Sequence, residues 1–324
     1  RRHSFPTRRS SDLMAANTSI TPRATSPIYR KRFGFMPNPA VAREIAGLDA
    51  QADCQRIVFL LTAYEFPWDI TRSLEIALFY TYASDTVSKL LDRTREFKDH
   101  GQKRYDDTRL LIAHFMESGW DGDVGSRALA RINQTHGNYR IPQDDFLFVL
   151  WTFIEFPMRW TADFSWRPMT AHEKNAWFNF WCEIGRRMGL VGIPDSKPAF
   201  DTFVQDYSHR HFVPAEASAR VADATLDIIR GWLPAPLHGL VAPAVSSLID
   251  EPAFLAAVHL QPAPALMQKA VTGSLKALAR LKRVCVIGGY PVMLADAPNR
   301  TYPGNRYEVE ALKPVHLQRR EDQA

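Results

Sequence analysis

Two helices predicted within residues 124–160 constrain this chain more than any other feature. The first helix places Leu129, Ile132 and His136 on one stripe, because residues three, four and seven positions apart share a helix face. The second helix is apolar almost all round. The imidazole of His136 is therefore expected to point into the protein. A buried imidazole needs a partner, which a hydrogen bond, an ion pair or a metal could supply.

Helical periodicity continues through most of the chain, and the sequence shows no alternating strand pattern and no internal repeat. Two helix starts carry clear signals. Asp69 is the expected N-cap of a helix over residues 70–82, and Thr170 and Glu173 form a capping box before another helix. These patterns predict an all-α fold, with a single large multi-helix domain over residues 41–313.

Two internal segments depart from this helical pattern. Residues 95–107 are strongly polar and are predicted to form a loop, followed by a helix that begins at Asp106 or Asp107, where a carboxylate would meet the helix dipole. Proline residues break residues 233–264 into short pieces. Those pieces could pack as ordinary short helices, cover a pocket or touch a membrane surface.

The ends of the chain are expected to lie outside the helical domain. Residues 1–13 are basic and aperiodic, stand immediately before Met14, and resemble translated sequencing-adapter read-through, so we expect them to be an artefact. They hold four Arg and one Asp, so without them the net charge falls from +5 to +2 and no case for nucleic-acid binding remains. Residues 14–40 are predicted to be a flexible arm, residues 301–314 an extended arm, and residues 314–324 a polar tail.

Several kinds of site lack the motifs that they require. The three cysteines are widely spaced, which indicates neither a zinc site nor covalently attached haem and suits a reducing compartment. There is no pair of Glu-x-x-His motifs for a di-iron centre, no Gly-rich phosphate loop and no G-x-S-x-G. No secretory signal follows Met14, and no apolar run reaches the roughly 18 residues of a membrane span. We therefore expect a cytoplasmic protein, with at most a peripheral contact with a membrane.

Three places in the sequence are candidates for chemistry, and each also has an ordinary structural explanation. His136 could be a hydrogen-bonded core residue, or the single neutral imidazole that a five-coordinate haem requires. Glu75 could form an ion pair with Arg72, or act as an acid whose pKa is raised by an apolar pocket. Arg93 and Thr94 could end an exposed helix, or lie beside bound oxygen.

Four segments together resemble the rubber oxygenase (latex clearing protein) catalytic-domain family, and in particular its MpaB-like branch. They read YEFPWDITRSLEIALFYTYASDTVSKLLDRT, RYDDTRLLI, RINQTHGNYRIPQDDFLFVLWTF and FWCEIGRRM. The likeness covers residues 32–313 and keeps the order of the segments. It implies an all-α oxygenase that holds haem b, and thus iron, through one proximal histidine similar in context to His136. Trp151 is expected in the same cofactor pocket.

The resemblance also implies roles for polar residues on the opposite, distal side. A basic residue next to a Thr in the family resembles Arg93 and Thr94. A further Arg, one helical turn before that Thr, would fall at Leu90, where Lys89 is the nearest basic residue and is assigned to the cofactor pocket. The catalytic Glu of the family stands about twenty residues before the Thr, which implies Glu75 as the acid or base.

Three functions follow from these features. The leading hypothesis is an oxygenase that uses haem and molecular oxygen to cleave a carbon–carbon double bond of an apolar, isoprenoid or otherwise unsaturated substrate. In it His136 holds the iron, oxygen binds near Arg93 and Thr94, and Glu75 removes or relays a proton. A haem-binding sensor or carrier would need His136 but not Glu75. A haem-free helical binding protein would need no cofactor.

Overall fold

The computed structural model describes residues 28–286 and 288–321. Within them the chain is helical, and the only β-type pairing consists of two isolated bridges. The all-α prediction is confirmed. The proposed artefact, residues 1–13, lies outside the described residues, as do residues 14–27 of the predicted N-terminal arm.

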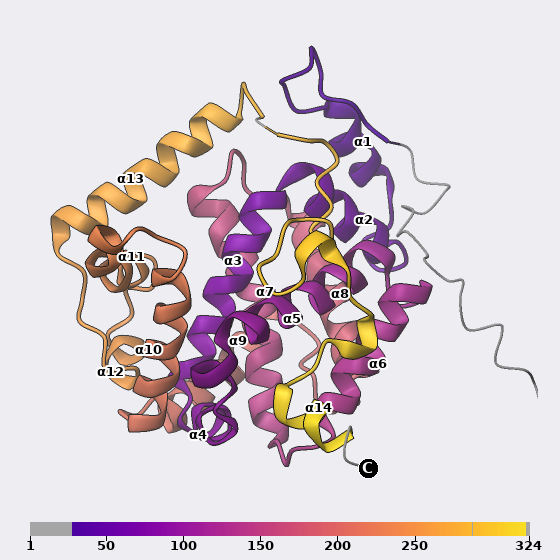
Figure 1. The fold of residues 1–324 in the computed structure, drawn as a ribbon. Coiled ribbons are helices and arrows are strands. Elements are labelled where there is room, and N and C mark those ends of the chain that lie inside the picture. The colour runs from indigo at the N-terminus through magenta and orange to yellow at the C-terminus, as the bar shows by residue number, and fades with distance from the viewer. Residues whose placement is uncertain (1–27, 287, 322–324) are drawn as a thin grey trace, which may run out of the picture.

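The helices follow one another along the chain and are labelled in Figure 1. They are α1 (Pro39–Gly47), α2 (Cys54–Leu60), the π-helical turn η1 (Leu61–Glu65), α3 (Pro67–Tyr80), η2 (Thr81–Ala83), α4 (Asp85–Thr94), α5 (Glu96–Ser118), α6 (Asp123–His136), α7 (Gln143–Phe164), α8 (Ala171–Arg187), α9 (Lys197–His211), α10 (Glu216–Arg230), η3 (Ala235–Leu240), α11 (Val241–Ser246), α12 (Pro252–Ala257), α13 (Ala265–Lys282), η4 (Pro303–Asn305), η5 (Val309–Ala311) and α14 (Val315–Glu321).

Helices α3 and α7 pack side by side through the middle of the molecule (Figure 1), and the other long helices surround them. Helix α8 packs on α7 and α2, while α5 packs on α6 and on α10. Aromatic residues dominate the core, and Phe115, Phe148, Trp177 and Phe180 have no appreciable exposed surface. Close packing of large rings fixes the relative positions of α5, α7 and α8, the helices that surround the candidate site.

The polar run at residues 95–107 is helical, so the predicted loop is wrong. Helix α5 begins at Glu96, bends at His100, where φ is −140° and ψ is 33°, and continues to Ser118. Its polar side chains have tertiary partners that the local sequence does not reveal. Gln102 accepts a hydrogen bond of 2.7 Å from Trp232, for example. Polar residues with such partners need no loop to bring them to water.

Asp69 is not the N-cap of α3, which is a second correction. Pro67 occupies the first helical position, which suits a residue without an N–H group, and Phe66 is the cap. Asp69 is buried in the first turn, and its carboxylate accepts hydrogen bonds from Trp160 at 3.2 Å and from Lys282 at 3.1 Å.

The capping box at the start of α8 is confirmed. The Thr170 hydroxyl accepts a hydrogen bond from the backbone N–H of Glu173, and the Glu173 carboxylate accepts one from the N–H of Thr170. Each residue thereby satisfies a donor that the first turn would leave unpaired.

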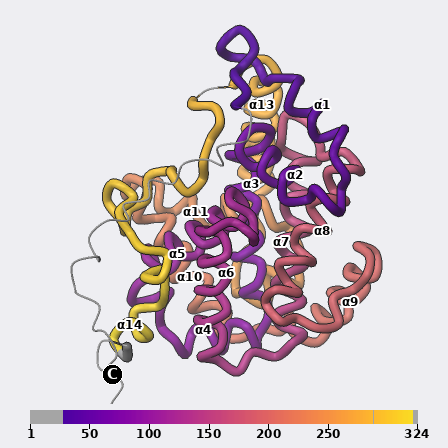
Figure 2. The backbone as a smooth tube through the Cα atoms, turned by 90° about the vertical axis from the view of Figure 1, so that its right-hand side faces the viewer, coloured from indigo at the N-terminus to yellow at the C-terminus, as the bar shows by residue number. Residues whose placement is uncertain are grey.

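The described end segments pack on the helical body instead of extending from it. Lys31 donates hydrogen bonds to the carbonyl groups of Val286 and Gly288. The segment after residue 300 forms η4, η5 and α14, whereas the sequence predicted an extended arm and a polar tail. Figure 2 shows this segment in yellow along the outside of α5 and α6, and η5 packs on α6.

The proline-broken region from η3 to α12 is partly ordinary packing. Val241 on α11 and Phe254 on α12 are buried, whereas none of the residues of η3 is. Leu237 and Leu240 on η3 are exposed. The helices of the described part of the chain are all too short or too polar to span a lipid bilayer.

Candidate active site

An apolar cavity of about 240 Å³ lies among α3, α4, α5, α6, α7 and α8. Leu111 and Phe115 of α5, together with Phe146, Val149 and Phe153 of α7, form part of its wall. Aliphatic and aromatic walls bind hydrocarbon and exclude water. The cavity thus suits an apolar ligand or a cofactor with a large apolar face.

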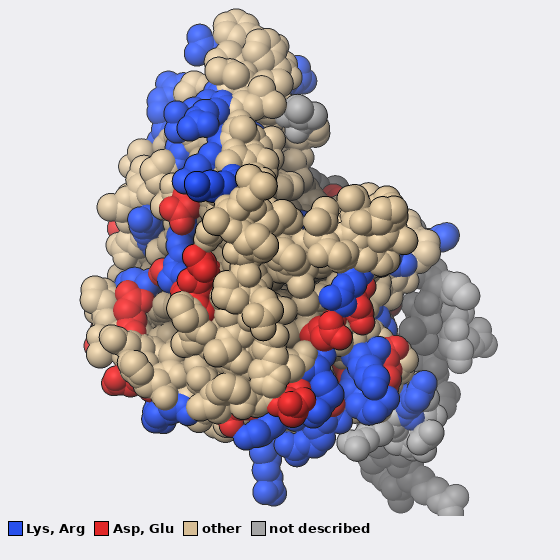
Figure 3. All heavy atoms as spheres, turned by 90° about the vertical axis from the view of Figure 1, so that its left-hand side faces the viewer, with Lys and Arg blue, Asp and Glu red and all other residues tan. Residues whose placement is uncertain are grey.

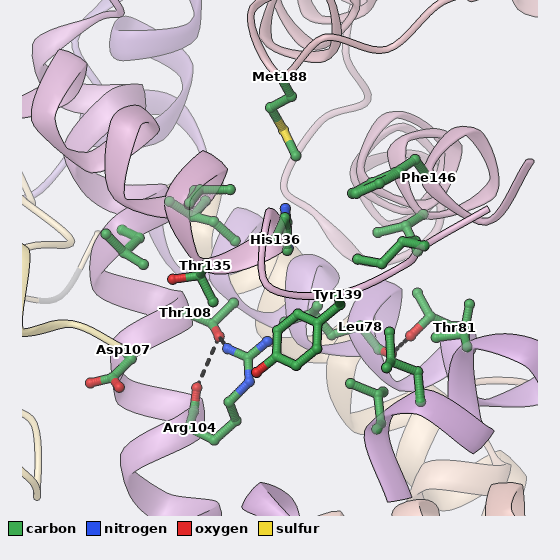
Figure 4. Close-up of a pocket in the computed structure, with 18 of the residues that line it drawn as sticks. Leu78, Thr81, Arg104, Asp107, Thr108, Thr135, His136, Tyr139, Phe146 and Met188 are labelled. Atoms are coloured by element: carbon green, nitrogen blue, oxygen red, sulfur yellow. Dashed lines mark hydrogen bonds between the residues drawn. The ribbon is translucent and has the colours of Figure 1, made fainter. Parts of the chain in front are cut away.

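His136 is the last residue of α6 and faces this cavity (Figure 4). Its Nδ1 is buried and has no hydrogen-bond partner among the described residues. The ring of Phe146 meets it edge to face, with 5.3 Å between the ring centroids. Burial, and to a lesser extent the positive charge of Arg104, lower the pKa of His136 to about 4. The imidazole is therefore neutral at pH 7 and keeps the lone pair that a metal needs.

Two polar residues of α5, Arg104 and Thr108, also line the cavity. The Arg104 guanidinium donates a hydrogen bond to the Thr108 hydroxyl, and Figure 4 shows both side chains on the same side of His136, beside Tyr139. No ion pair joins Arg104 to a carboxylate of the described residues. The cavity wall therefore presents a cation to whatever occupies the site.

The C-terminal segment closes part of the cavity. Leu312, Lys313 and Pro314 line it, and α14 follows directly. The buried Glu96 carboxylate accepts hydrogen bonds from the first two backbone N–H groups of α14 at 3.1 Å and lies 2.6 Å from Nδ1 of His316. The negative charge of Glu96 satisfies the positive N-terminus of α14 and holds the segment in place.

Of the other residues predicted for the cofactor and oxygen site, only some line this cavity. Thr94 lines it, as expected for a residue of the site. Arg93 is exposed, Lys89 pairs with Asp85 at the surface, and Trp151 is buried on α7. Arg93, Lys89 and Trp151 are not among the described residues that line the cavity.

Glu75 lies outside the cavity wall, within a polar cluster between α3 and α5. Its carboxylate forms the expected ion pair with Arg72 at 2.7 Å and accepts a hydrogen bond of 2.5 Å from the hydroxyl of Tyr105. Burial raises the pKa of Glu75, although Arg72, Tyr105 and Arg109 act in the opposite direction. Both interpretations made from the sequence, the ion pair and the raised pKa, thus describe parts of the same environment.

Sequence reasoning missed Arg104, which lay in the predicted loop of residues 95–107, and Thr108, which lay at the start of the helix predicted to follow it. The signal was present in the segment RYDDTRLLI, where an Arg precedes a Thr by four residues, or one helical turn. That is the spacing that the family resemblance implies for its distal side. The structure places such a pair on the cavity wall at Arg104 and Thr108, whereas the position one turn before Thr94 is Leu90.

The site offers one histidine, not a cluster of metal ligands. Among the described residues no three His, Cys, Asp or Glu side chains come together as they would around a chelated ion. His136 is the histidine on the cavity wall that could contribute a ligand to the metal of a bound cofactor.

The fold and cavity together define an all-α protein with one neutral histidine on the wall of an apolar chamber. The family model described as "ER-bound oxygenase mpaB/B'/Rubber oxygenase, catalytic domain" matches residues 81–297. The chain belongs to this family of oxygenase catalytic domains and is by class an oxidoreductase. The matched segment contains His136, Arg104 and Thr108.

Three curated relatives agree with this assignment. ER-bound oxygenase mpaB of Penicillium roqueforti (strain FM164) is 29% identical over 205 residues, which cover 58% of this chain and 69% of the relative. ER-bound oxygenase mpaB' of Penicillium brevicompactum is 29% identical over 218 residues, covering 62% and 52%. ER-bound oxygenase mpaB of the same species is 31% identical over 194 residues, covering 54% and 50%. The chain thus spans about half the length of the latter two relatives.

Proposed function

We propose that this chain is a haem b-dependent oxygenase that acts on an apolar, isoprenoid or otherwise unsaturated substrate, by oxidative cleavage or oxygenation of a carbon–carbon double bond. The observation that carries the proposal is His136, a neutral imidazole on the wall of an apolar cavity in a chain of an oxygenase family.

The residues around the cavity fit haem b. The buried Nδ1 of His136 lacks a hydrogen-bond partner among the described residues, which is costly unless a bound group completes the site. Aromatic and aliphatic walls suit the apolar faces of a porphyrin. When bound, haem would supply the iron at which molecular oxygen reacts.

We assign separate roles to the polar residues of the cavity wall. Arg104 places a positive charge in an apolar chamber, where it would stabilise negative charge that develops during oxygenation. Thr108 accepts a hydrogen bond from Arg104 and so fixes the position of the guanidinium. Thr94 also lines the cavity, and we keep its predicted role beside bound oxygen. We assign the basic distal role to Arg104 instead of Arg93, because Arg93 is exposed.

Glu75 remains a candidate acid or base through Tyr105. The Tyr105 hydroxyl donates to Glu75, and Tyr105 adjoins Arg104 in the sequence of α5. Burial raises the pKa of the Glu75 carboxyl, a shift typical of groups that donate protons near neutral pH.

The test of cofactor binding is the visible absorption spectrum of the chain, expressed with a supply of haem, beside that of His136→Ala. We expect a Soret band in the parent that is lost or shifted in the variant. His209→Ala is the matched control, because His209 is exposed and distant in sequence from the cavity residues, and its spectrum should equal that of the parent. A folded parent without haem would refute the proposal and favour a haem-free binding protein.

A second assay distinguishes an oxygenase from a haem-binding sensor or carrier. The haem-loaded chain is incubated with an unsaturated isoprenoid and a reductant, with and without oxygen. Oxygen-dependent oxidised or cleaved product is expected. A stable Soret band without product across a series of unsaturated lipids would favour the sensor or carrier.

A further inference from the structure

Helix α13 lies along the outer edge of the molecule and presents most of its surface to solvent (Figure 1). Ala279 is its one fully buried residue, and its inner face packs on α11 and α7. Lys282 anchors the C-terminal end of the helix, because it pairs with the buried Asp69 at 3.1 Å and lies 4.1 Å from the ring centroid of Trp68. These contacts fix which side of α13 faces outward.

The outward side carries a basic stripe. Lys269, Lys276 and Arg280 of α13, and Arg283 at its C-cap, are all exposed and stand seven, four and three residues apart. Arg283 also donates a hydrogen bond of 2.8 Å to the backbone carbonyl of Trp166. At about 100° per residue these positions fall within about 60° of one another around the helix axis. The sequence contains no Asp or Glu from residue 265 to residue 295. The stripe is therefore not neutralised by acidic residues of its own segment.

Large apolar side chains lie next to this stripe. Leu266 is 81% exposed, Leu281 47% and Val284 55%. On the helix Leu266 and Leu281 fall on the flank of the basic stripe, on the side away from Ala279, and Val284 lies in the turn that follows the helix. A row of basic residues bordered by large apolar side chains is the pattern found in helices that lie on a membrane surface.

Figure 3 shows the face of the molecule on which α13 lies. Lys and Arg gather in its upper part, Asp and Glu lie directly beneath them among further basic residues, and uncharged surface covers much of the centre of this view. Helix α11 packs on both α13 and η3, and η3 adds the exposed Leu237 and Leu240. Residues 231–249, which include η3 and α11, contain no Asp, Glu, Lys or Arg.

We propose that the outward face of α13 docks the protein on an anionic lipid surface. Basic residues would meet the negative headgroups, while Leu266, Leu281 and Val284 would enter the apolar boundary beneath them. A nucleic acid would satisfy the charges but leave these apolar side chains in water. A lipid surface satisfies both, and it is a source of apolar molecules for the cavity. The docking depends on no cofactor and can be tested without one.

The test uses the full chain and flotation with lipid vesicles. One set of vesicles contains phosphatidylcholine with about a third of phosphatidylserine, and the other contains phosphatidylcholine alone. The chain is expected to float with the first set, and to bind the second set at least about tenfold more weakly because the charge term is absent. Equal binding to both sets, or no binding to the anionic set, would overturn the proposal.

A charge-neutralised variant locates the surface. Lys269→Gln, Lys276→Gln and Arg280→Gln are combined, because all three are exposed and have no ion pair among the described residues. Each basic residue near an anionic surface contributes about a fivefold change in partition, so the triple variant should bind about 100-fold more weakly. The control combines Gln substitutions at three exposed basic residues elsewhere: Arg43, Lys98 and Arg140.

The control variant loses the same net charge and should bind almost as the parent does. Equal weakening of both variants would show that net charge alone attracts the protein, and would refute a specific face. A further variant, Leu266→Ser with Leu281→Ser, should reduce the binding that survives in high salt, where charge attraction is screened. No change in that variant would contradict the insertion of α13. Equally tight binding of the parent to duplex DNA in the same buffer would also overturn the proposal.

Discussion

Removing the buried histidine of α5, His114, should change how the stability of this protein depends on pH. His114 is 1% exposed, and its Nε2 lies 2.9 Å from the hydroxyl of Tyr307 in the C-terminal segment. Burial, with a smaller contribution from the charge of Arg127, lowers its pKa to about 4 from the ordinary value of 6.5. The folded state therefore keeps the ring neutral between these two values, while the unfolded chain binds a proton.

The sign and size of the effect follow from this difference. The contribution of His114 to the free energy of unfolding is fully present above pH 6.5, falls as the pH drops toward 4, and is constant below pH 4. Between pH 7 and pH 5 the unfolded state gains about 2 kcal/mol from this one group. His114→Gln keeps a side chain able to hydrogen-bond to Tyr307 but cannot titrate. The variant should thus lose about 2 kcal/mol less stability than the parent over that interval.

The assay is urea unfolding of parent and variant at pH 7 and pH 5. His136 titrates in both proteins and cancels in the comparison. His209→Gln is the matched control, since His209 is exposed, and its pH dependence should equal that of the parent. If His114→Gln and the parent lost the same stability between pH 7 and pH 5, the argument from burial would be refuted.

Three further predictions concern the same helix and the site. Burial raises the pKa of Glu117 to about 8, so the contribution of its protonated form to stability is lost as the pH rises from about 4.5 to 8. The free energy of unfolding of Glu117→Gln, measured by urea unfolding, should therefore rise by about 2.5 kcal/mol relative to that of the parent between pH 5 and pH 7. Arg104→Gln should lower oxygen-dependent turnover at least about tenfold, whereas Arg93→Gln should stay within about twofold, and the reverse order would contradict the assignment. Glu75→Gln should leave the haem spectrum intact and lower turnover about 100-fold, and an unchanged rate would remove Glu75 from the mechanism.

The sequence predicted the parts of the fold that depend on local signals. The stripe formed by Leu129, Ile132 and His136 needs only helix periodicity, and it places His136 toward the cavity as expected. The capping box of Thr170 and Glu173 needs only two side chains and one turn of backbone. In such cases the partners are a few residues apart, so the sequence contains the whole interaction.

The errors have a common physical cause, which is that polar residues found partners far along the chain. Asp106 accepts hydrogen bonds from the backbone and hydroxyl of Thr301, and Asp107 accepts one from Tyr302. No local pattern shows that a carboxylate will meet a segment nearly two hundred residues later. Residues 95–107 were consequently predicted to be a solvated loop, so Arg104 was not recognised as a site residue, and neither was Thr108, one helical turn further on.

The C-terminal segment sets a lower limit on how far this enzyme can be shortened. The family match ends at residue 297, yet residues 312–314 form part of the cavity wall. A version cut at residue 297 would leave the buried carboxylates of Glu96, Asp106 and Asp107 without several of their donors and would open the chamber to water. In mutant libraries or chimaeras built from the matched segment alone, substitutions that restore the cavity wall would be selected before substitutions that improve catalysis. A useful exchangeable unit for engineering therefore extends through α14.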